Sequence, residues 1–157
     1  MKLHYLFTHY NKKNRGQLFP LLKAFIKNDS FTDKKRIAMY HISEKEVELV
    51  ENIQEADICI LTMSWNYYLS NDQYHQAVEY IEKANAAEKQ VWTWMSGDFG
   101  VKLNLEADYL VFRHSGHRSQ LLENHIGMPT FINDPLEKYF QTTEVQYPYY
   151  STQPVVG

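Results

Sequence analysis

Short apolar runs alternate along the chain with stretches in which apolar residues recur every three or four positions. The run "DICILTM" (57–63) is nearly continuous in apolar residues, which is typical of a parallel strand covered on both faces. Further runs predict strands at 3–7, 36–42, 90–96, 108–113 and 129–132. The stretches between them predict helices at 17–27, from Ser43, from Ser70 or Asn71, and at 117–125. This alternation predicts an α/β fold, a three-layer Rossmann-like domain with a central, mostly parallel sheet.

Local signals support three of these helices. Pro20 falls in the first turn of 17–27, where its missing N–H costs little. Ser43 and Glu46 have the spacing of a capping box, and the apolar stripe behind it is expected at Val47, Val50 and Ile53. The long helix after Asn71 should bury one face, made of Tyr74, Ala77, Val78, Ile81 and Ala84.

Composition narrows the class of protein. The formal charge of −3, from 16 basic and 19 acidic residues, gives no general attraction to polyanions, so nucleic acid is not an expected partner. The single cysteine, Cys59, allows no internal disulfide and indicates a reducing compartment. No stretch approaches the ~20 apolar residues of a membrane span, and the first residues lack a signal-peptide pattern. We expect a cytoplasmic protein, with peripheral attachment at the inner face of a membrane as the alternative.

The end of the chain differs from the rest. Residues 144–154 contain Tyr and Pro residues in the pattern of an extended linker, and "PVVG" (154–157) resembles the start of a new strand. We therefore predict one Rossmann-like domain at 1–143, followed at 144–157 by a linker and the start of a second domain that the chain does not contain.

Ligands of parallel sheets gather at the carboxyl ends of the strands, where the strand order reverses. The corresponding loops are expected at 8–16, 63–71, 96–107 and 113–118. The first of these has no phosphate-binding glycine pattern. Its basic residues, Lys12, Lys13 and Arg15, could meet an anion near the start of the following helix, but a solvated surface is the favoured interpretation.

Asp98 follows the predicted strand 90–96 within Ser-Gly-Asp-Phe-Gly. An Asp in such a sequence can bond the neighbouring backbone and form a turn. A carboxylate at the carboxyl end of a central strand can also accept a proton from a bound hydroxyl. The residues alone leave both interpretations open.

The segment "SWNYYLSND" (64–72) is predicted to be a loop in which Trp65, Tyr67 and Tyr68 surround Asn66. Aromatic rings beside an amide suit the binding of a sugar or another polar ring. The same rings could equally cover the core, so both alternatives stay open.

A second candidate site lies where strand 108–113 is expected to lead into a helix. Free backbone N–H groups at such a junction, flanked by basic side chains, suit an anion or sugar hydroxyl. The residues concerned are Arg113, His114, Ser115, His117 and Arg118. The alternative is that Ser115 only caps the helix. No third metal ligand stands near His114 and His117 at a recognisable spacing, so no metal is expected.

The stretch "VWTWMSGDFG", followed by "DYLVFRHSGHRSQLLENHIGMPTFINDP", resembles the amino-terminal half of bacterial exostosin-like glycosyltransferases. These enzymes have two Rossmann-like domains, the GT-B arrangement. The resemblance covers about residues 90–157 and rests on Gly97-Asp98, Phe112-Arg113, Ser115-Gly116, Met128-Pro129, Asp134-Pro135 and the terminal "PVVG".

The resemblance implies that this chain is the acceptor-side domain of a glycosyltransferase of cell-surface polysaccharide biosynthesis. Sugar would pass from a nucleotide-sugar donor, bound mainly by the second domain, to a glycan or lipid-linked acceptor. It further implies no cofactor or bound metal, and a base supplied by Asp98, with His9 and His114 as the next candidates. Without its second domain the chain is expected to be inactive. The alternative function is a stand-alone α/β ligand-binding or regulatory domain; a flavodoxin-like redox module fits less well, because the loop after the first strand is a poor phosphate loop.

Overall fold

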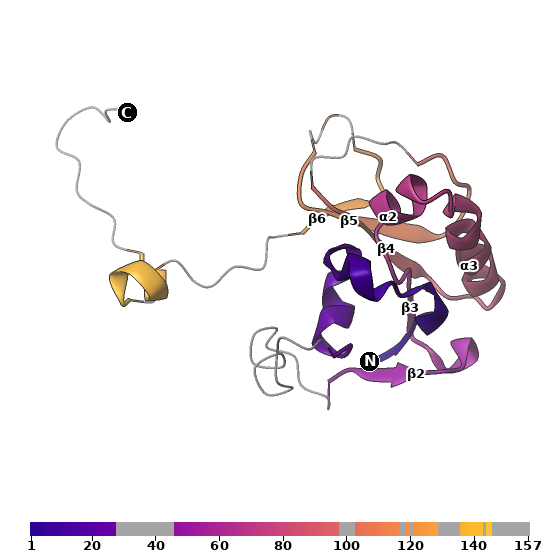
Figure 1. Ribbon diagram of the computed structural model, residues 1–157, viewed down its shortest axis with the longest axis horizontal. Helices are drawn as coiled ribbons and strands as arrows, with labels where there is room; N and C mark the ends of the chain where they lie inside the picture. The colour runs from indigo at the N-terminus through magenta and orange to yellow at the C-terminus, as the bar shows by residue number, and fades with distance from the viewer. Residues whose placement is uncertain are drawn as a thin grey trace.

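The structure is a computed structural model that describes residues 1–27, 46–97, 103–116, 119, 121–128, 136–142 and 144–145. Within them, six strands form one sheet in the order β2-β1-β3-β4-β5-β6, and every neighbouring pair is parallel (Figure 1). The strands are β1 (Lys2–His4), β2 (Glu48–Val50), β3 (Ile58–Ile60), β4 (Val91–Met95), β5 (Tyr109–Arg113) and β6 (His125–Gly127). The predicted α/β, Rossmann-like fold is confirmed.

The two faces of the sheet are covered by different elements. Thr93 and Val111 are register partners on one face, where Thr93 binds Trp65 of α2 (Trp65–Ser70). Helix α3 (Tyr74–Ala86) packs beside α2 on this face. Since side chains alternate along a strand, Phe112 points the other way, and its ring meets Phe19 at the start of η3 (Pro20–Ala24). The sheet is therefore the middle of three layers.

The remaining helices are short. Two 3₁₀ helices, η1 (Phe7–His9) and η2 (Lys12–Gln17), lie in the connection after β1. A third, η4 (Ile53–Glu55), links β2 to β3, and η6 (Leu136–Phe140) is a π-helix that lies apart from the sheet (Figure 1). Among the described residues, no helix has the length and apolar character needed to cross a membrane.

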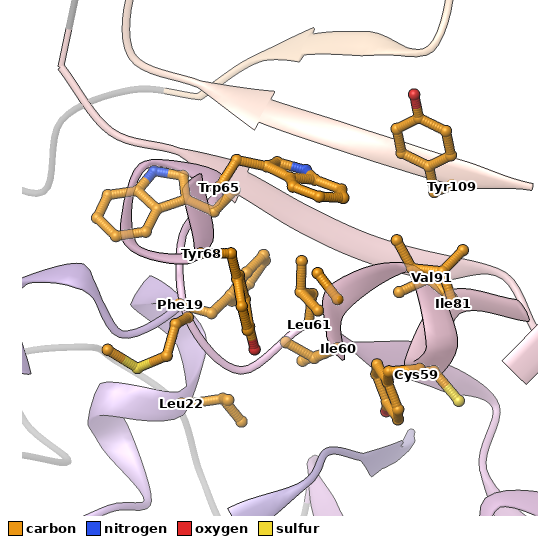
Figure 2. Close-up of a cluster of buried hydrophobic side chains, with 14 of the residues drawn as sticks. Phe19, Leu22, Cys59, Ile60, Leu61, Trp65, Tyr68, Ile81, Val91 and Tyr109 are labelled. Carbon is orange, nitrogen blue, oxygen red and sulfur yellow. The ribbon is translucent and has the colours of Figure 1, made fainter. Parts of the chain in front are cut away.

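Large buried side chains fill the space between α2, α3 and the central strands (Figure 2). Trp65 and Tyr68 of α2 are both 0% exposed and share this layer with aliphatic residues from the end of β3, from α3 and from β4, among them Leu61, Ile81 and Val91. Two aromatic side chains of this size bury enough apolar area to hold α2 firmly on the sheet.

Helix α3 confirms part of the predicted apolar face, because Ala77, Ile81 and Ala84 are buried, but Tyr74 is exposed, Val78 is only partly buried, and Tyr80 is buried in addition. The helix begins at Tyr74, however, because Ser70 and Asn71 end α2 instead of starting α3: the Asn71 amide donates to the Tyr67 carbonyl (2.8 Å). Asp72, with φ 55°, then turns the chain between the two helices.

The predicted loop at 64–72 is wrong. Ser64 caps the amino end of α2, its hydroxyl accepting the Tyr67 N–H at 3.2 Å, so the segment continues as a helix. Trp65 and Tyr68 stand three positions apart and both enter the core, which is the spacing of a helix face. Because 64–72 contains many polar and aromatic residues, the segment looked like a loop in sequence, although Trp65 and Tyr68 have helical spacing.

The predicted helix from Ser43 is also wrong where the structure describes it. Ser43 and the predicted strand 36–42 lie outside the described residues, but Glu48–Val50 is strand β2, paired in parallel with β1. The valines at 47 and 50 suit a strand, because β-branched side chains favour the pleated backbone. Ladder bonds to β1 decide between the two conformations.

The predicted helix at 17–27 is shorter, and the predicted helix at 117–125 is not found over 121–125, the longest part of it that the structure describes. Pro20 does occupy the first helical position, but the helix that it starts is only the short 3₁₀ helix η3. Residues 121–124 are not helical, and His125 opens β6. The predicted strand at 129–132 lies outside the described residues, and the proposed boundary at residue 143 is not tested by the fold.

Candidate functional site

The strand order reverses between β1 and β3, which places the carboxyl ends of these two strands at a topological switch point. The chain leaves β1 through η1 and η2, and leaves β3 toward α2 on the other face. Two hydrogen bonds join these departing segments. His9 Nδ1 pairs with the Tyr68 hydroxyl at 3.0 Å, and the Asn11 amide donates to the Tyr67 hydroxyl at 3.1 Å.

His9, a predicted catalytic residue, is half-buried in this position. Burial lowers the pKa of His9, and the nearby Glu79 charge opposes that shift. Burial raises the pKa of Tyr68, so its phenol stays protonated. When His9 donates from Nδ1 to Tyr68, its Nε2 lone pair is available to accept a proton.

A second group of contacts joins the segments after β1, β3 and β4. The Ser64 and Ser96 hydroxyls both donate to the Gln17 side-chain oxygen, at 2.5 and 2.9 Å. The Ser64 N–H also donates to the Gln17 carbonyl at 2.7 Å. Gln17 therefore joins the segments that follow β1, β3 and β4 at the end of the sheet where the carboxyl ends of the strands lie. We call this end of the sheet the carboxyl edge.

Asn66 fixes the exit of β4. Its amide nitrogen donates to the Ser96 carbonyl at 3.1 Å, and its oxygen accepts the Ser96 N–H at 2.9 Å. From the other side, the Ser115 hydroxyl donates to the Gly97 carbonyl at 2.9 Å. Gly97 has φ 60°, a conformation that glycine adopts without strain. The backbone that leads to residue 98 is thus held from two sides, although Asp98 itself lies outside the described residues.

The aromatic residues of the predicted sugar platform belong to the core. Trp65 is 0% exposed, and its indole N–H donates to the Thr93 hydroxyl at 2.9 Å. Tyr67 is 6% exposed. Of the two interpretations left open for these rings, the structure supports core packing, while the Tyr67 hydroxyl and the Asn66 amide reach the carboxyl ends of the strands.

The predicted residues around the end of β5 are divided between interior and surface. Arg113 is 6% exposed and contacts His125 Nδ1 at 3.3 Å, so its guanidinium lies beneath the edge. Burial lowers the pKa of Arg113, and burial together with the Arg113 charge lowers the pKa of His125. His114 is exposed and its ring meets the Trp94 ring edge-on at 5.7 Å. His117 and Arg118 lie outside the described residues.

Several residues of this edge were missed by sequence reasoning: Asn11, Gln17, Ser64 and Ser96. The side-chain contacts of Gln17 with Ser64 and Ser96 join residues that are 47 and 79 positions apart in the chain. Ser64 carried a readable signal, because it precedes a helical pattern as an N-cap residue does. Gln17 carried none.

A separate open hollow of about 390 Å³ lies at the opposite, amino edge, beside Tyr109 and Asn124. Its polar lining includes Asn104 and Glu106. None of the predicted site residues that the structure describes borders it. Among the described residues, no three side chains of metal-binding type converge on one point.

Comparison of the chain with known protein families, with curated proteins and with solved structures finds no match.

Proposed function

We propose that this chain is the acceptor-side domain of a glycosyltransferase and binds the hydroxyl groups of a glycan or lipid-linked acceptor at its carboxyl edge. The observation that carries the proposal is the convergence of amide, hydroxyl and imidazole groups from the segments after β1, β3, β4 and β5. Such groups both donate to and accept from sugar hydroxyls. The resemblance over residues 90–157 supplies the reaction class.

In the proposed reaction, an acceptor hydroxyl oxygen attacks the anomeric carbon of a nucleotide sugar, and the bond to the nucleoside diphosphate breaks. A base at the edge takes the hydroxyl proton. Asp98 is the first candidate because the backbone before it is held by Asn66 and Ser115. His9 is the second, since its neutral ring stands at the switch point. The donor would be bound by a second domain.

A stand-alone ligand-binding or regulatory domain is the second candidate. The observation that favours it is the burial of Trp65 and Tyr67, which removes the aromatic platform expected for a sugar. In this case the same edge binds a polar ligand, and Asp98 forms a turn.

The experiment that separates the two candidates is Asp98→Asn in the natural full-length protein. If Asp98 is the base, acceptor-dependent release of nucleoside diphosphate falls about 100-fold while the melting temperature changes little. Unchanged turnover with a lowered melting temperature would assign Asp98 to the turn. No release from any donor in a panel of nucleotide sugars would favour the binding domain.

A further inference from the structure

Two cations beside the carboxyl edge have no carboxylate partner in the part of the chain that the structure describes. Arg15, at the end of η2, and Lys23, in η3, are both half-buried. Arg15 donates to the Lys23 carbonyl at 3.1 Å, so the Arg15 guanidinium lies beside the backbone from which the Lys23 side chain extends. Neither forms an ion pair with a carboxylate among the described residues.

The surroundings of Lys23 fix the position of its ammonium group. It donates to the Gly16 carbonyl at 3.2 Å and lies over the Trp94 ring, 5.2 Å from the centroid. The exposed His114 ring also meets the Trp94 ring, edge-on with 5.7 Å between the ring centroids. Because Gly16 precedes Gln17 in the chain, this patch adjoins the polar contacts of the edge.

The charge of the patch is poorly compensated. Burial lowers the pKa of Lys23, and the charge of Arg15 lowers it further. A half-buried cation normally gains a carboxylate partner, because desolvation without one is unfavourable. Among the described residues, the ammonium has one hydrogen-bond acceptor for its three N–H groups, and the guanidinium has two partners for its five.

We propose that Arg15 and Lys23 form a binding site for an oxyanion, a carboxylate or phosphate group, carried by the ligand of the carboxyl edge. An oxyanion there would accept the remaining N–H groups of both side chains and offset their mutual repulsion. The inference goes beyond the proposed reaction, because the anion would be bound whether or not a sugar is transferred.

The test is a titration of the chain with inorganic phosphate, glucose 6-phosphate, glucuronate and neutral glucose at constant ionic strength. Binding is followed by calorimetry and by the ¹H–¹⁵N signal of the Trp94 indole. The site predicts saturable binding of at least one anion and no response to glucose. Comparing the binding of glucose 6-phosphate with that of glucuronate decides whether the site binds a phosphate or a carboxylate group.

Substitutions assign the binding to the two cations. Lys23→Met keeps an aliphatic chain over Trp94 but removes the charge, and Arg15→Gln tests the second cation independently of how well the Lys23 variant folds. Each should weaken anion binding about tenfold, the value of one hydrogen bond to a charged group. Lys13→Met is the matched control, an exposed lysine of the same loop, and should stay within about twofold if local contacts, and not net charge, hold the anion.

Two results would overturn the site. One is equal weakening by all three substitutions, which would mean diffuse attraction of anions to a basic loop. The other is the absence of saturation with every anion tested. Neither result bears on sugar transfer, which is measured separately by release of nucleoside diphosphate from the natural full-length protein.

Discussion

Two histidine–tyrosine pairs stand side by side on the α3 face of the sheet, and they differ in what they can reach. His4 of β1 pairs through Nδ1 with the Tyr80 hydroxyl at 2.9 Å, and His9 pairs in the same way with Tyr68 at 3.0 Å. The His9 and Tyr80 rings meet edge-on at 6.2 Å. His4 is only 6% exposed, whereas His9 is half-buried at the end of η1.

The difference is one of position and not of chemistry. The Tyr80 hydroxyl also donates to the His4 carbonyl at 3.0 Å. The His4–Tyr80 pair, called the inner pair below, therefore links β1 to α3 and has no route to a ligand. The His9–Tyr68 pair, called the outer pair, bridges η1 and α2 at the switch point, where a ligand can approach. A buried histidine hydrogen-bonded to a tyrosine is therefore a structural element in one place and a candidate site in the other.

The largest effect is expected from Tyr80→Phe. This change removes a donor to the His4 carbonyl and leaves His4 Nδ1 without its partner inside the protein. The free energy of unfolding should fall by about 1–3 kcal/mol, the cost of leaving buried polar groups unsatisfied. Urea denaturation measures it. A smaller loss of unfolding free energy than that caused by Tyr68→Phe would contradict the conclusion that the inner pair is the structural one.

Sequence periodicity predicted much of what surrounds these pairs. The continuous apolar runs at 57–63, 90–96 and 108–113 became β3, β4 and β5, because strands covered on both faces need apolar residues at nearly every position. The spacing of Ala77, Ile81 and Ala84 predicted α3 for the corresponding reason. Local pattern was sufficient wherever one conformation buries the apolar residues much better than the other.

Elsewhere, contacts distant in sequence decided the outcome. Glu48–Val50 became a strand through its ladder with β1, 46 residues away at Lys2 and Glu48. Among the candidate site residues, His9 was placed at the switch point and Asn66 at the edge, but Trp65 and Tyr67 proved to be core. Pairing of Gln17 with Ser64 and Ser96 depends on how three loops meet, which no single segment encodes.

A pH titration sharpens the comparison. Burial lowers the pKa of His4, while the Glu51 carbonyl opposes this and the Lys83 charge adds to it. The native state therefore favours neutral His4, and the unfolded chain binds its proton at a higher pH, near 6.5. Stability from this group is complete above pH 6.5 and declines as the pH falls below it.

Unfolding free energies at pH 7.5 and 5.5 measure this effect, with His4→Gln as the variant and His75→Gln as the control, an exposed histidine of α3. The wild type and the control should lose stability toward pH 5.5, and His4→Gln should lose less. An identical pH dependence in all three proteins would mean that His4 is not held neutral.

A smaller effect is expected from Tyr68→Phe. The His9 ring is half-buried, so water can replace the lost hydroxyl, and the free energy of unfolding should fall by about 1 kcal/mol or less. Urea denaturation beside Tyr80→Phe gives the comparison directly. Equal losses would mean that both pairs are structural.

The most direct test of the account compares the two histidines in the natural full-length protein. Acceptor-dependent release of nucleoside diphosphate is measured for His9→Gln and His4→Gln, each rate divided by the folded fraction. If the edge at the switch point binds the acceptor, the rate per folded molecule falls at least about tenfold for His9→Gln and stays within about twofold for His4→Gln. Equal rates per folded molecule for the two variants would contradict the placement of the site at this edge.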